Sequence, residues 1–187
     1  MMVPSVTPML LTFAMINRSR HPHGLVFVPV WVFLAGYVTM WTAFSLVATL
    51  AQWGLHNVGL ISPMMVGTSP LLGSLVLMLA GIYQWTPFKR ACLKHCRGPL
   101  QFLLNYWRDG NMGAFLMGVR HGAYCLGCCW LLMAILFAVG VMNLVWIAVL
   151  SVFVLLEKII PRESLVARTA GILLVGCGGW LALSGGA

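Results

Sequence analysis

The run LVFVPVWVFLAGYVTMWTAFSLVATLAQW, residues 25–53, contains no Asp, Glu, Lys or Arg. A transmembrane helix needs about 20 mainly apolar residues, because each residue advances it by about 1.5 Å across a hydrocarbon core of roughly 30 Å. A strand would leave backbone groups unpaired in lipid unless it closed a barrel, and the alternating pattern of a barrel strand is absent. The run therefore predicts a membrane-spanning helix.

Similar apolar stretches occur on both sides of this run. We expect spans near 1–16, 25–53, 71–83, 112–139, 141–159 and 165–183. Composition agrees, because 61% of the residues are hydrophobic and only 7% are charged, whereas soluble domains carry about 25% charged residues. The expected fold is all-α, a polytopic transmembrane helical bundle of about six spans, with residues 1–187 forming a single integral membrane domain.

The basic residues are placed as topological signals. The chain has 11 Lys and Arg against three acids, a net charge of +8. A nucleic-acid partner would require a solvated basic face or a known binding fold, and the sequence has neither. By the positive-inside rule, the basic loops lie in the cytoplasm of a bacterial inner membrane, with both termini outside. The basic loop residues are Arg18, Arg20, Lys89, Arg90, Lys94, Arg97, Arg108, Lys158 and Arg162.

The third predicted loop holds a first group of candidate metal ligands. Cys92, His95 and Cys96 are spaced i, i+3 and i+4. If this run is helical, the three side chains share one face, so two thiols and an imidazole converge.

The fourth predicted span holds the second group, spaced i, i+4, i+7 and i+8. Its members are His121, Cys125, Cys128 and Cys129. At 100° per residue they fall within roughly a 100° arc of one helical face. Cys128 and Cys129 are adjacent and cannot face one ion equally well, so one of the two is a candidate for packing alone.

Thiolates and imidazoles suit soft or borderline metals, so copper is the leading candidate and zinc the alternative. Both groups are predicted at or near the cytoplasmic side, where thiols stay reduced and disulfides are the less expected use. The alternative is packing, because a lone cysteine in a transmembrane helix usually serves as a small apolar residue.

Arg120 is an ionisable residue inside the fourth span, which is costly unless it is paired or reaches the headgroups. We expect it to approach Glu157, and snorkelling is the alternative. Gly118 and Gly122 form a small-residue ridge on the same span, which favours close helix packing.

Several strings together resemble a bacterial family of predicted metal-binding integral membrane proteins, otherwise a domain of unknown function. The run YCLGCCW at 124–130, within GVRHGAYCLGCCW at 118–130, is highly specific. The resemblance covers almost the whole chain and implies a polytopic membrane fold with a predicted metal site, but no reaction. The other matching strings are GY at 36–37, WTAF at 41–44, AGIYQWTPFK at 80–89, CLKHCR at 92–97, VGVMNL at 139–144 and LEK at 156–158.

Two functions follow as hypotheses. The first is a metal-handling membrane protein, for copper, that binds or relays an ion between the two groups and exchanges it with a metallochaperone or other membrane subunits. The second is an accessory, structural or assembly subunit of a larger membrane complex without bound metal. An enzyme is less expected, because the few carboxylates are not placed with a base and a nucleophile. A Cys125–His121 nucleophile and base pair is the enzymatic alternative.

Overall fold

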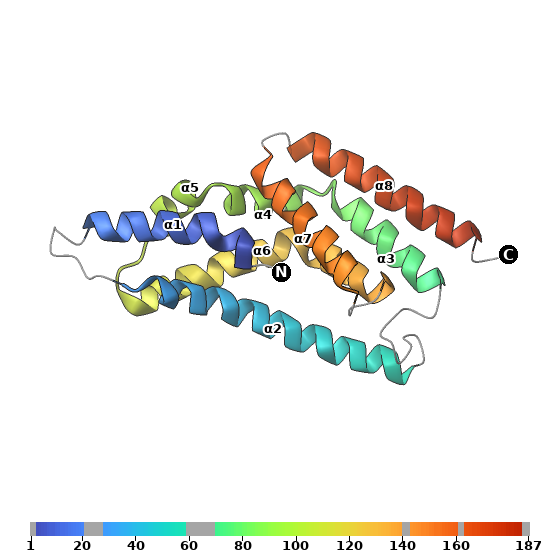
Figure 1. Ribbon diagram of the computed structural model, residues 1–187, viewed down its shortest axis with the longest axis horizontal. Coiled ribbons are helices and arrows are strands. Elements are labelled where there is room, and N and C mark those ends of the chain that lie inside the picture. Colours follow the sequence, from blue (N-terminus) through green and yellow to red (C-terminus); the bar gives the residue numbers. More distant parts are fainter. Residues whose placement is uncertain (1–2, 21–27, 59–69, 140–142, 161–162, 185–187) are drawn as a thin grey trace. The chain divides into compact units, whose positions relative to one another are not determined.

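The computed structural model describes residues 3–20, 28–58, 70–139, 143–160 and 163–184. All regular structure in these ranges is helical (Figure 1), which confirms the all-α fold class. The helices are α1 (Val3–Arg20), α2 (Val30–Asn57), α3 (Pro70–Tyr83), α4 (Pro87–Arg97), α5 (Pro99–Tyr106), α6 (Gly110–Val139), α7 (Leu144–Ile159) and α8 (Glu163–Ser184).

The described residues contain fewer candidate membrane spans than the expected six or so. In the described ranges, α2, α6 and α8 are long and apolar enough to cross a bilayer, and α3 with α4 gives a fourth crossing if that bent pair counts as one span. α7 has 16 residues, fewer than the about 20 that a crossing needs. α1 ends with Arg18 and Arg20 and contains Pro8. The count of six is therefore not confirmed.

The bend between α3 and α4 measures 67° and has a local cause. The Thr86 hydroxyl donates to the Tyr83 carbonyl over 2.8 Å and accepts from the Lys89 amide over 3.3 Å. It thereby caps the last turn of one helix and the first turn of the next. Pro87 follows at the first position of α4, where its missing N–H costs nothing.

Two compact units are distinguished by their internal contacts. The first contains residues Val47–Arg90 and Cys129–Ala187. Within it, α3 lies along α8 (Figure 1). A Cβ atom added at Gly81 would lie 2.8 Å from the Gly171 carbonyl oxygen, so only glycine permits this backbone approach.

The second unit contains residues Met2–Leu46 and Ala91–Cys128. Within it, the backbones of α2 and α6 approach closely, and this approach too depends on glycine. A Cβ atom at Gly36 would overlap the Phe115 carbonyl, and one at Gly118 would overlap the Phe33 carbonyl. The predicted packing role of Gly118 is thus confirmed, and the close approach brings the buried faces of the two helices together.

α1 and α5 complete the second unit. Phe13 of α1 lies 5.2 Å from the Phe33 ring and 5.5 Å from the Trp107 ring, centroid to centroid. The Asn17 side-chain amide donates a hydrogen bond to the Val28 carbonyl and accepts one from the Val28 amide. These two bonds hold Val28, which precedes α2, against α1. At the exposed edge, Arg20 pairs with Asp109 over 3.1 Å.

Candidate metal centre

Three of the predicted ligands lie on one buried face of α6. His121, Cys125 and Cys128 are 1%, 0% and 2% exposed. Because α6 runs without interruption from Gly110 to Val139, the i, i+4 and i+7 spacing in the sequence becomes one side of a regular helix. This face is turned to the interior of the protein.

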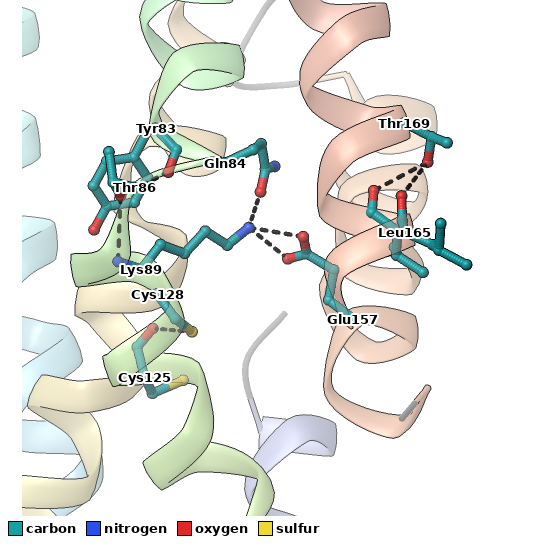
Figure 2. Close-up of polar contacts among 10 residues, drawn as sticks. Tyr83, Gln84, Thr86, Lys89, Cys125, Cys128, Glu157, Leu165 and Thr169 are labelled. Atoms are coloured by element: carbon teal, nitrogen blue, oxygen red, sulfur yellow. Dashed lines mark hydrogen bonds and ion pairs between the residues drawn. The ribbon is translucent and has the colours of Figure 1, made fainter. Parts of the chain in front are cut away.

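Hydrogen bonds as well as packing hold the two thiols. Cys125 Sγ lies 3.3 Å from the hydroxyl oxygen of Tyr37, on α2. Cys128 Sγ donates to the Cys125 carbonyl over 3.0 Å, as Figure 2 shows. The two sulfur atoms therefore have defined surroundings on neighbouring turns of one helix.

The His121 imidazole sits among aromatic rings. Its centroid is 5.3 Å from the Phe102 ring, 6.0 Å from the Tyr37 ring and 6.1 Å from the Phe33 ring. These rings exclude water from the histidine, so an ion at this position would be held in an apolar environment.

Cys129 is also buried. It follows Cys128 directly, so its side chain leaves the helix about 100° further round. It lies only about 40° from Cys125, so it stands at the edge of the same face, and which of the adjacent pair only packs stays a prediction.

The run from Cys92 to Cys96, predicted to be a loop with a possible helical course, is a helix and forms much of α4. Cys92 is buried, and Cys128 is among the groups near its thiol. Cys96 is half-buried. The two groups of predicted ligands are thus linked at one point, through Cys92 and Cys128.

His95 is anchored on α6 by stacking. Its ring lies 4.3 Å from the Tyr124 ring with an interplanar angle of 8°. Its Nδ1 atom is 2.9 Å from the Ala91 carbonyl oxygen. A carbonyl can only accept, so Nδ1 carries the proton, and Nε2 keeps the lone pair that a metal would use.

Within the described ranges, no group of three or more His, Cys, Asp or Glu side chains is gathered so that it could hold a metal ion. The seven predicted ligands therefore stay a prediction. The donor types on the α6 face still discriminate between metals, because zinc requires about four ligands in a tetrahedron whereas copper(I) accepts two or three soft ligands. Two buried thiols beside an imidazole fit copper(I).

A buried ion pair was not anticipated. The Lys89 ammonium lies 2.7 and 2.8 Å from the two carboxylate oxygens of Glu157 and also donates to the Gln84 side-chain oxygen (Figure 2). All three residues are buried. The sequence predicts a loop position for Lys89 because the positive-inside rule counts charges without considering burial.

The predicted Arg120–Glu157 pair is not among the ion pairs of the described residues, in which Glu157 binds Lys89. The Arg120 guanidinium instead lies 3.8 Å from the centroid of the Tyr106 ring, on α5. Arg120 is exposed. A cation over an aromatic face gains about 0.5–1 kcal/mol at an exposed site, and the arginine head remains accessible.

Comparison with known proteins identifies a family. No curated protein and no solved structure matches the chain. The sequence model of the PpoB2 family, described as a copper chaperone, matches residues 1–181 of the 187. This agrees with the copper chemistry that the buried thiols and imidazole favour. The chain therefore belongs to the PpoB2 copper chaperone family.

Proposed function

We propose that this protein is an integral membrane copper-binding protein that holds copper(I) on Cys125 and Cys128, with His121 beside them, and releases it through α4. The observation that carries the proposal is the buried face of α6, on which these three side chains are aligned. The family to which the chain belongs, described as a copper chaperone, supports the choice of metal. Buried thiols suit copper(I) because it is soft and needs few ligands.

Release requires a second set of ligands within reach of the first. Cys92 and Cys128 are both buried, on α4 and α6, and Cys128 is near the Cys92 thiol, so a copper–sulfur bond to Cys92 would form as the bond to Cys128 breaks. The incoming thiol gives up its proton to solvent, and the displaced thiolate regains one. Copper stays in the +1 state throughout, so the transfer needs no oxidant or reductant.

The outer end of this route is formed by His95 and Cys96. His95 presents Nε2 while its Nδ1 proton is held by the Ala91 carbonyl, an arrangement common among metal-binding histidines. Cys96 is half-buried and follows His95 directly. These two ligands would exchange copper with a metallochaperone or another membrane subunit, and Cys129 would pack.

The proposed environment is the lipid bilayer of a bacterial inner membrane, with the basic loops in the cytoplasm and both termini outside. Large apolar side chains along α2 support lipid contact, since Trp31, Leu46, Leu50 and Trp53 are all more than half exposed. The Arg20–Asp109 ion pair supports a shared membrane face for the loops after α1 and before α6.

Copper content tests the proposal. The protein is purified in detergent under reducing, oxygen-free conditions, equilibrated with copper(I), passed through a desalting column and measured by elemental analysis. We expect bound copper in the wild type and in C177S, because Cys177 is an exposed thiol on α8. We expect its loss in C125S/C128S, with the helical circular dichroism unchanged.

The same measurement evaluates the alternative of a metal-free assembly subunit. That function is favoured by the lack, among the described residues, of a gathered group of three ligands. It predicts that the wild type retains no more copper than the double variant. Parallel equilibration with zinc decides between the two metals.

A further inference from the structure

Tyr37 brings a phenol hydroxyl to the α6 thiols from a different helix. It is 1% exposed, and its oxygen lies 3.3 Å from Cys125 Sγ. Residues 25–53 contain no Asp, Glu, Lys or Arg, so Tyr37 lies in an apolar run. A hydroxyl group buried there costs free energy unless it is hydrogen-bonded. The sulfur atom of Cys125 supplies such a partner.

The backbone around Tyr37 fixes this contact. Gly36, the residue before it, lies against the Phe115 carbonyl of α6, and Gly118 of α6 lies against the Phe33 carbonyl of α2. The main chains of the two helices are therefore in contact at two points close to Tyr37. A tyrosine has only two side-chain torsions, and the ring of Tyr37 is further confined by His121 at 6.0 Å. The hydroxyl therefore has little freedom to leave Cys125.

Copper would determine the direction of the hydrogen bond. While Cys125 keeps its thiol proton, either the hydroxyl or the thiol can be the donor. When copper(I) bonds to the sulfur, the thiol proton leaves to solvent and the sulfur retains only lone pairs. A phenol keeps its proton near neutral pH, so Tyr37 is then the donor.

We propose that Tyr37 is a positioning residue for copper, which donates a hydrogen bond to the copper-bound sulfur of Cys125 and so strengthens binding there. The inference rests on the proposed function, because it requires Cys125 to be a ligand. Hydrogen bonds to charged acceptors are roughly twice as strong as neutral ones, so the contact favours the copper-bound state. Its loss should weaken copper binding on the order of tenfold.

The test uses Tyr37→Phe, which removes the hydroxyl and keeps the ring, with Tyr83→Phe as the matched control. Tyr83 lies on α3 and packs on Trp130 and Phe88. Copper(I) affinity is measured in detergent by competition with a chromophoric copper(I) chelator. In the metal-free protein, infrared spectroscopy follows the S–H stretch of Cys125, assigned by its loss in C125S.

We expect Y37F to bind the same amount of copper with roughly tenfold lower affinity, and to shift the Cys125 S–H band. Y83F should do neither. If Y37F and the wild type have equal affinity while C125S/C128S loses copper, the role of Tyr37 is overturned and the α6 site stands. If the wild type itself retains no copper, both inferences are overturned.

Discussion

The buried Lys89–Glu157 pair allows a quantitative prediction. The Lys89 and Glu157 side chains are 1% and 4% exposed, and the shorter N–O distance is 2.7 Å. With an effective dielectric constant of about 20, the attraction at this distance is about 6 kcal/mol. The cost of removing both charges from water offsets much of this, so the intact pair contributes little relative to apolar side chains of similar volume.

Removing one partner has a different effect, because it leaves a buried charge without its counterion. We expect K89M and E157M each to lower the free energy of unfolding by about 3–5 kcal/mol. We expect the double variant K89M/E157M to be within roughly 1 kcal/mol of the wild type, because neither charge then remains. Both methionines approximate the volume of the side chains that they replace.

The assay is unfolding in detergent micelles by a denaturing surfactant, followed by circular dichroism, for the wild type and the three variants. The losses in unfolding free energy of the two single variants should not add up in the double variant. The coupling energy, which is the difference between that sum and the loss in the double variant, should be several kcal/mol. If each single variant loses less than about 1 kcal/mol, as exposed pairs do, or if the double variant equals the sum of the singles, the pair does not have the buried character assigned to it.

Three further predictions concern packing, capping and thiol access. Gly118→Leu should keep α2 and α6 apart, so the variant should be aggregated or poorly inserted, as size-exclusion chromatography can show. The control variant Gly176→Ala should elute as the wild type does, because an added Cβ there meets nothing within 4 Å. Asn143→Ala should lower the free energy of unfolding by about 1 kcal/mol, because the Asn143 side chain accepts hydrogen bonds from two backbone amides at the start of α7. An unchanged melting temperature would contradict the capping role. In native detergent-solubilised protein, the half-buried Cys96 should react with maleimide before the buried Cys125, which should react only after unfolding. Mass spectrometry of labelled peptides can show this, and equal labelling rates would refute the burial of Cys125.

The ligand face of α6 was predictable because it depends on helical periodicity alone. Once residues 112–139 are read as a helix, His121, Cys125 and Cys128 must share one side. The packing role of Gly118 followed in the same way, since a glycine in a lipid-embedded helix usually marks close approach.

The partners of the charged residues were not predictable from local patterns. Lys89 and Glu157 are 68 positions apart, so only the packed structure brings them together. Arg120 lies over the Tyr106 ring, and that ring belongs to α5, a helix within the segment that the sequence predicts to be a loop. Pro99, a residue type that suits the first position of a helix, was the available sequence signal for α5.

The role of Tyr37 required the structure for a related reason. The sequence shows Gly36-Tyr37 in an uncharged run, but the thiol that meets the hydroxyl lies on another helix, 88 positions away. The count of six spans is not confirmed either, because apolar character alone does not tell a crossing helix from a short or bent one such as α7 or the α3–α4 pair.

X-ray absorption at the copper edge of the copper(I)-loaded protein tests the central claim most directly, because it identifies the atoms bonded to the metal. With Cys125 and Cys128 as ligands, the wild type and C177S should both show a copper(I) edge and two sulfur neighbours. C125S/C128S, prepared at the same copper concentration, should lack that sulfur shell. A first shell of nitrogen and oxygen only in the wild type, or the same two sulfur neighbours in C125S/C128S, would contradict copper binding by the thiols of α6.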